Sequence, residues 1–127
     1  MSAKDQNAVL IVDDDEELRG LVAFSCRQMG FQAHTVESAE QAREWLGRNK
    51  PSLVIIDIMM PGGNGLELCQ WIRAQPGLET LPIIVNSGLK DDETVQDALE
   101  LGAVDFLHKP FAMAALQEKI KRARIGQ

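Results

Sequence analysis

An unbroken apolar run that ends in a carboxylate constrains the fold of this chain more than any other feature. Residues 53–56 are all aliphatic, Asp57 follows them, and Pro61 with several glycines interrupts the chain shortly afterwards. Such a run is typical of a strand buried on both faces of a parallel sheet, and the residues after it are typical of a loop. The pattern therefore predicts that Asp57 lies at the carboxyl end of a central strand, the edge at which open α/β sheets bind ligands. The alternative is an Asp that merely starts a turn.

Composition narrows the class of protein. The 127 residues suffice for one domain without disulfides, and a net charge of -6 argues against non-specific binding of nucleic acid. Cys26 and Cys69 form no CxxC pair and have no histidine at zinc-site spacing, so we interpret both as small buried hydrophobes. The N-terminus is polar and no apolar run has membrane-spanning length, so we expect a cytoplasmic protein without a membrane segment.

Strand-like segments alternate with helix-like segments along the whole chain. The four further strand-like segments are residues 8–12, 31–36, 81–85 and 103–107. Residues 15–17 are acidic and suit the start of the first helix, and Ser38 with Gln41 forms a capping-box pattern at the start of the second. Five strands alternating with five helices predict an α/β fold with a parallel sheet and right-handed crossovers. We expect one domain, residues 1–127, with a core of about residues 8–124.

Four of the five expected strands end on polar side chains at one edge of the sheet. Asp13 and Asp14 follow the first strand, Asp57 the third, Ser87 the fourth and Lys109 the fifth. Carboxylates this close repel one another unless a cation bridges them, and Mg²⁺ prefers oxygen ligands. A lysine and a hydroxyl suit a phosphoryl group, and a carboxylate beside them can form an acyl phosphate. The set predicts a site for a phosphoryl group and its metal, with Asp57 as the nucleophile.

In this arrangement the chain resembles the receiver domain of the two-component response-regulator family over nearly its whole length. The matching features, in chain order, are the pair Asp13-Asp14, the stretch from Asp57 through Pro61 to Gly65, Ser87, Phe106, and Lys109-Pro110. The resemblance implies a flavodoxin-like, doubly wound sheet of five parallel strands in the order 2-1-3-4-5, with five helices. It also implies a cis bond between Lys109 and Pro110.

The resemblance implies how the acids are used. Asp57 accepts a phosphoryl group from a phosphohistidine on a sensor histidine kinase or a histidine phosphotransfer protein. Mg²⁺, with Mn²⁺ as an alternative, is bound by Asp14, Asp57 and the backbone carbonyl of Met59, and by Asp13 through a water molecule. A protein of this kind is not an enzyme in the usual sense, because it catalyses only its own phosphorylation and slow dephosphorylation.

The resemblance also implies a switch. Lys109 and Ser87 contact the phosphoryl group, and Phe106 changes rotamer as the loop after Ser87 moves. A downstream protein then recognises the face formed by the fourth helix, the fifth strand and the fifth helix, with the chain a monomer or a phosphorylation-linked dimer. The chain departs from the usual pattern at several positions: Asn86 replaces an apolar or small residue, Gly88 replaces the usual Ala, residues 62–64 are richer in glycine, and Phe106 lacks the hydroxyl of the common Tyr.

Other functions fit less well. A flavodoxin-like cofactor binder needs a first loop rich in Gly, Ser and Thr, whereas the acids of residues 13–15 repel a bare phosphate. A phosphatase of the haloacid-dehalogenase type needs a second Asp two residues after the nucleophile, where this chain has Met59. A degenerate receiver that serves only as a docking module is disfavoured, since every phosphorylation residue is present. The chain is either a stand-alone regulator or part of a longer protein.

Overall fold

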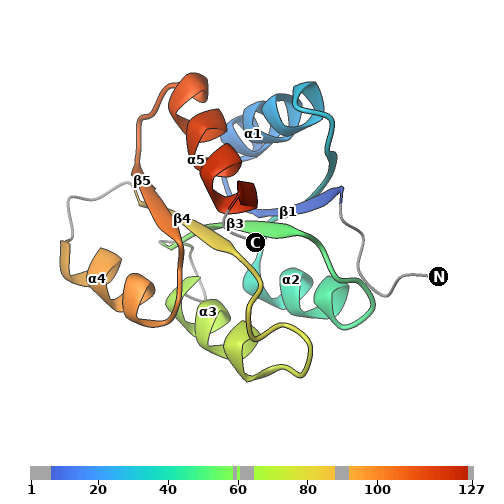
Figure 1. Cartoon of the computed structure of the whole chain (residues 1–127), viewed down its shortest axis with the longest axis vertical. Helices are drawn as coiled ribbons and strands as arrows, with labels where there is room; N and C mark the ends of the chain where they lie inside the picture. Colours follow the sequence, from blue (N-terminus) through green and yellow to red (C-terminus); the bar gives the residue numbers. More distant parts are fainter. Residues whose placement is uncertain (1–6, 59, 61–64, 88–91, 126–127) are drawn as a thin grey trace.

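The computed structural model describes residues 7–58, 60, 65–87 and 92–125, which form five strands and five helices in strict alternation (Figure 1). The elements are β1 (Ala8–Val12), α1 (Glu16–Gln28), β2 (Gln32–Val36), α2 (Ala39–Leu46), β3 (Leu53–Asp57), α3 (Gly65–Ala74), β4 (Ile83–Ser87), α4 (Asp92–Glu100), β5 (Asp105–His108) and α5 (Met113–Ile125).

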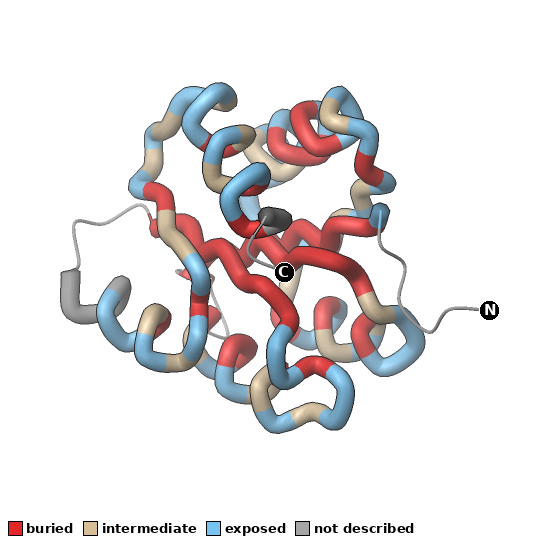
Figure 2. Tube along the Cα trace, viewed as in Figure 1, coloured by how far each residue is buried: buried red, intermediate tan, exposed pale blue. Residues whose placement is uncertain are grey.

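The strands form one parallel sheet in the order β2-β1-β3-β4-β5, which confirms the predicted fold class. Helices α1 and α5 cover one face of the sheet, and α2, α3 and α4 cover the other (Figure 1). Because β3 lies at the centre, every residue from Leu53 to Asp57 is buried, as the apolar run predicted. Figure 2 shows the buried strands at the centre of the molecule, whereas β2 lies at an edge and alternates between exposed and partly buried residues as far as its buried last residue, Val36.

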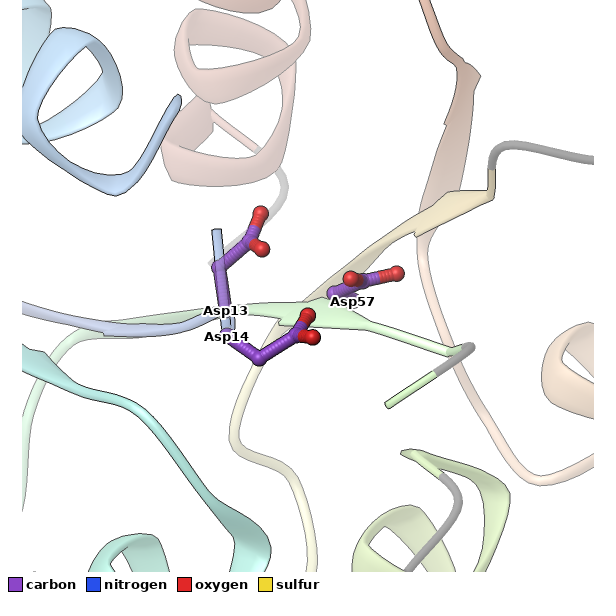
Figure 3. Close-up of side chains that lie close together, drawn as sticks. All are labelled: Asp13, Asp14 and Asp57. Carbon is purple, nitrogen blue, oxygen red and sulfur yellow. The ribbon is translucent and has the colours of Figure 1, made fainter. Parts of the chain in front are cut away.

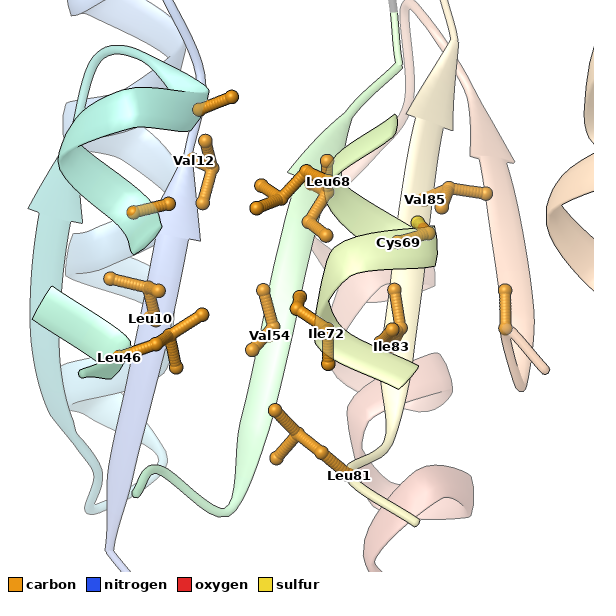
Figure 4. Close-up of a cluster of buried hydrophobic side chains, with 14 of the residues drawn as sticks. Leu10, Val12, Leu46, Val54, Leu68, Cys69, Ile72, Leu81, Ile83 and Val85 are labelled. Atoms are coloured by element: carbon orange, nitrogen blue, oxygen red, sulfur yellow. The ribbon is translucent and has the colours of Figure 1, made fainter. Parts of the chain in front are cut away.

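Alternation along the strands divides the apolar residues into two cores, one on each face of the sheet. In β1, Val9 and Ile11 pack with residues of α1 and α5, whereas Leu10 and Val12 pack with residues of α2 and α3 (Figure 4). We call these the α1/α5 core and the α2/α3/α4 core. A strand buried between two cores has little freedom to shift, so its last residue is held in a fixed place.

Three strands differ from their predicted bounds, β2 only in that it begins one residue later, at Gln32. Strand β4 runs to Ser87 and so includes Asn86, which the sequence placed after the strand, and β5 begins at Asp105 and ends at His108. Asn86 pairs in register with Asp57 of β3 on one side and with Leu107 of β5 on the other. Pairing on both sides overrides the turn preference of Asn, which is a weak and local effect.

Helix starts follow the sequence closely. Asp15 is the N-cap of α1, and its Oδ1 accepts hydrogen bonds from the backbone N–H groups of Glu17 at 3.1 Å and Leu18 at 3.2 Å. At α2, the Oγ of Ser38 accepts from the N–H of Gln41 at 3.1 Å. The reciprocal bond of the capping box differs from the standard pattern, because Gln41 accepts from the N–H of Glu37, one residue before the cap.

Both thiols are buried in the two cores, as predicted. Burial raises the pKa of Cys26 to about 12 and that of Cys69 to about 11, since an apolar environment disfavours the thiolate. The structure thus gives neither cysteine the thiolate character of a reactive group. None of the helices described is both long and apolar enough to cross a membrane.

Gly65, the first residue of α3, packs directly against the end of β3. Its N–H donates to the carbonyl of Ile58 at 2.8 Å. A Cβ atom added at this glycine would lie 2.7 Å from the carbonyl oxygen of Asp57 and 2.7 Å from the Cα of Ile58. Backbone atoms cannot move aside as the end of a side chain can, so the close approach of α3 to Asp57 requires glycine.

We therefore expect Gly65→Ala to lower the free energy of unfolding by about 2 kcal/mol, the usual range for overpacking a rigid site. Gly20→Ala is the matched control, because Gly20 is an exposed residue inside α1 with nothing within 4 Å of the added Cβ. That control should raise the free energy of unfolding by about 0.5–1 kcal/mol through helix propensity. Urea denaturation measures both changes, and equal effects at the two glycines would contradict the packing argument.

Candidate functional site

Three carboxylates meet at the carboxyl edge of the sheet. Asp13 and Asp14 follow β1, Asp57 ends β3, and one oxygen of each lies within 4.8 Å of the others (Figure 3). Their proximity follows from the register, in which Val12 and Ile56 are paired neighbours immediately before the acids. Asp13 and Asp57 are only 1% and 3% exposed, whereas Asp14 is exposed.

Lys109 brings a positive charge to these acids. Its Nζ donates to Oδ2 of Asp57 at 3.1 Å and lies 3.4 Å from Oδ2 of Asp13. The backbone N–H of Lys109 donates to the carbonyl of Ser87 at 2.7 Å, which fixes the lysine beside the end of β4. The Lys109-Pro110 bond is cis, which confirms the prediction. Burial pulls the pKa of Lys109 down, but the hydrogen bond and charge of Asp57, with Asp13, outweigh burial and leave this pKa raised.

The three carboxylates fit a divalent cation. One ammonium leaves them with an excess of two negative charges in a largely buried site, which oxygen-ligated Mg²⁺ would neutralise. Oδ1 of Asp13 accepts from the N–H of Asp15 at 2.9 Å. Oδ2 of Asp13 is buried without a hydrogen-bond donor among the described residues, although Lys109 stands at ion-pair distance. Met59, expected to contribute its carbonyl, lies outside the described residues.

The two expected switch residues, Ser87 and Phe106, belong to the face of the sheet opposite to that of Asp57. Ser87 is the last residue of β4 and is 2% exposed. Phe106 in β5 pairs with Val85, is half-buried and packs against the α2/α3/α4 core. The Nζ of Lys119 lies 5.7 Å from the Phe106 ring centroid and 2.9 Å from Oδ1 of Asp105. The ring is therefore held from one side by an α5 lysine.

Sequence reasoning missed the roles of two polar residues, Asn86 beside the acids and Arg73 at the opposite edge of the sheet. Asn86 is 1% exposed, and its side-chain oxygen has no hydrogen-bond partner among the residues described. Arg73 of α3 donates to the carbonyls of Leu78, Leu101 and Gly102, so it ties α3 to the turn after α4. In the sequence Asn86 stood out only as a departure from the usual residue, and Arg73 gave no signal because two of its three partners, Leu101 and Gly102, are distant in sequence.

Comparisons with known proteins agree with this geometry. A family model described as the response regulator receiver domain matches residues 9–121. The transcriptional regulatory protein GltR of Pseudomonas aeruginosa is 39% identical over 121 residues, which are 95% of this chain and 50% of that protein. The phosphate regulon transcriptional regulatory protein PhoB of Rhizobium meliloti is 33% identical over 113 residues, covering 89% of this chain and 50% of that protein.

A crystal structure of a response regulator receiver protein from Pseudomonas putida is similar at a TM-score of 0.86 and 36% identity. The match covers 93% of this chain and 98% of that one. A signal receiver domain of a histidine kinase from Syntrophus aciditrophicus is similar at a TM-score of 0.85 and 33% identity, covering 94% and 91% of the two chains.

The doubly wound sheet and its acidic edge with one lysine define the receiver class of signalling domain. The chain belongs to the response regulator receiver family of two-component systems. Receiver domains are signalling domains rather than classical enzymes, and they work with histidine kinases or phosphotransfer proteins. The chain spans about half the length of the curated relatives it matches.

Replacing Lys109 should show how far the stability of the folded protein depends on its charge beside the buried acids. We expect Lys109→Met to lower the free energy of unfolding at pH 7 by about 2 kcal/mol, because two buried carboxylates lose their counter-charge. Arg122→Met is the control, since Arg122 pairs with Glu118 at 3.5 Å on an exposed surface and should change stability by less than about 0.5 kcal/mol. Chemical denaturation compares the two, and a Lys109 variant as stable as the control would show that the acids need no ammonium.

Proposed function

We propose that Asp57 accepts a phosphoryl group from a phosphohistidine on a histidine kinase or phosphotransfer protein, and that this switches the receiver. The observation that supports the proposal most directly is the placement of Asp57. It is a buried carboxylate at the end of the central strand, bound to Lys109 at 3.1 Å and grouped with Asp13 and Asp14. A lysine whose pKa is raised, despite its own burial, by buried carboxylates marks a candidate functional site.

The chemistry follows from these groups. A carboxylate oxygen of Asp57 attacks phosphorus in line, and the bond from phosphorus to the donor's imidazole nitrogen breaks, so that the imidazole leaves with the electron pair. Lys109 moves from the carboxylate toward the phosphoryl oxygens and balances their charge. Asp13, Asp14 and Asp57 would hold Mg²⁺, or Mn²⁺, with the Met59 carbonyl. When bound, the cation supplies charge neutralisation for the phosphoryl group.

Recognition of the donor is supported by an apolar groove next to Lys109. The groove has a volume of about 440 Å³ and is lined by residues from α1 and the segment after β5, namely Asp15, Glu17, Leu18, Leu21, Lys109, Pro110, Phe111 and Met113. Leu21 and Phe24 of α1 are 49% and 59% exposed, although Leu21 has the spacing of a core residue. We propose that the phosphohistidine-bearing protein covers this apolar surface of α1 while its histidine reaches Asp57 past Lys109.

Propagation of the signal uses the opposite face of the sheet. In the proposal, the Ser87 hydroxyl donates to a phosphoryl oxygen, and the segment after β4 moves with it. Phe106 lies on the same face and two register positions from Ser87, so its half-buried ring responds to that movement. The face formed by α4, β5 and α5 then changes for a downstream protein, or for a second copy of the chain.

The same proposal covers the extent of the domain, its place in the cell and its catalytic activity. We expect residues 1–127 to act as one receiver domain in the cytoplasm. Its contribution to catalysis is limited to its own phosphorylation and slow dephosphorylation. A docking module without phosphorylation is disfavoured by the ion pair between Lys109 and Asp57, and a flavodoxin-like cofactor binder by the acids at the end of β1.

Labelling with a small phosphodonor tests the acceptor. Incubation with acetyl phosphate and Mg²⁺ should add one phosphoryl group to the native protein, and Asp57→Asn should abolish the added mass, because an amide is not a nucleophile of this kind. Asp105→Asn is the control, since Asp105 pairs with Lys119 away from the acids and should label like the native protein. Intact-mass spectrometry reads all three, and undiminished labelling of Asp57→Asn would exclude Asp57 as the acceptor.

Substitutions of the neighbouring residues Asp14 and Asp15 test the proposed metal site. Asp14→Ala should weaken Mg²⁺ binding at least tenfold, because it removes one carboxylate of the cluster. Asp15→Ala should leave Mg²⁺ binding unchanged and lower the free energy of unfolding by about 1 kcal/mol, because Asp15 caps α1. Titration calorimetry and denaturation separate the two effects. Equal losses of Mg²⁺ affinity at both positions would mean that the cluster has been assigned one residue out of register.

A further inference from the structure

Asn86 is a buried amide at the site whose oxygen lacks a partner. The residue is 1% exposed, and no described residue donates a hydrogen bond to its Oδ1. A buried acceptor without a donor loses its bonds to water and gains nothing in return. An unsatisfied buried group in a native structure calls for an explanation, and a functional role is one of those that apply.

The sheet order places Asn86 beneath the ion pair of the site. Strand β4 lies between β3 and β5, and Asn86 is the register partner of Asp57 on one side and of Leu107 on the other. The ion pair of 3.1 Å joins Asp57, at the end of β3, to Lys109, which follows β5. The long side chain of Lys109 therefore crosses β4 from just beyond the Ser87–His108 pair to the level of the Asp57–Asn86 pair.

Alternation places the amide on the face that the lysine crosses. In β3 and β4, Ile55 and Ile84 belong to the α1/α5 core, so Asp57 and Asn86, two residues further on, project from that same face. Leu107 of β5 also belongs to this core, and Lys109 is two residues beyond it. Ser87 alternates to the opposite face. Asn86 is thus the β4 side chain that lies under the path from Lys109 to Asp57.

We propose that Asn86 is a positioning residue for Lys109, whose ammonium donates to the Asn86 side-chain oxygen when phosphoryl transfer draws it away from Asp13. An ammonium has three hydrogens. In the structure one is donated to Asp57, and Asp13 faces the ammonium at 3.4 Å without hydrogen-bond geometry. A fixed acceptor on β4 would hold the ammonium over the acceptor oxygen while the phosphoryl group arrives. This inference rests on the proposed function of Asp57.

The test combines Asn86→Leu with Lys109→Met in a double-mutant cycle. Leucine has the branched shape and the number of side-chain heavy atoms of asparagine without its amide, but its methyl groups are larger, so we expect some loss of stability from overpacking and compare rates per folded molecule. The rate of labelling by acetyl phosphate, per folded molecule and at saturating Mg²⁺, should fall about tenfold. In the Lys109→Met protein, Asn86→Leu should slow labelling less than twofold further, because the group it positions is already gone.

A residue with only a structural role gives a different pattern. Substitution of such a residue would change the unfolding transition, but the labelling rate per folded molecule would stay the same. An unchanged rate in Asn86→Leu would overturn the inference, as would the same loss of rate with and without Lys109. If the native protein itself fails to label at Asp57, the proposed function fails instead. Labelling of the native protein thus separates the two failures.

Discussion

The balance of charge at the carboxyl edge of the sheet is the constraint on which the rest of the site depends. Two carboxylates, Asp13 and Asp57, are almost completely buried, and Lys109 is held beside both. One cation does not neutralise this group together with Asp14, so the site keeps an excess of negative charge. That excess fits a divalent cation, which in the proposed function would offset part of the charge of a phosphoryl group. The carboxylates would thus attract the cation, and the cation would in turn attract the phosphoryl group.

The alternation of side chains divides the work between the two faces of the sheet. Asp57, Asn86 and Lys109 belong to the face covered by α1 and α5, where the groove next to Lys109 opens. Ser87 and Phe106 belong to the face covered by α3 and α4. In the proposals made above, Asn86 acts in the chemistry and its neighbour Ser87 in the switch, so one short strand would connect the two.

The structure differs from the sequence-based prediction where tertiary contacts outweigh local conformational preference. An Asn after an apolar run predicts a loop. Strand β4 nevertheless extends through Asn86 and Ser87, because it pairs with β3 on one side and with β5 on the other. Leu21 has helical spacing with the core residues of α1 and is nevertheless half exposed, because the apolar face of a helix is wider than the surface that covers it. Neither outcome has a signal in a single sequence.

The sequence by itself determined the order of elements, the parallel sheet and the polar strand ends that place Asp57 beside Asp13. These follow from hydrophobic periodicity and from the rule that parallel strands end at one edge, which are local or topological properties. Only the tertiary structure decided that Lys109 bonds to Asp57 across β4 with Asn86 beneath it. The reason is physical: such contacts depend on register, on the face of each side chain and on burial, and these are fixed only when the whole sheet packs.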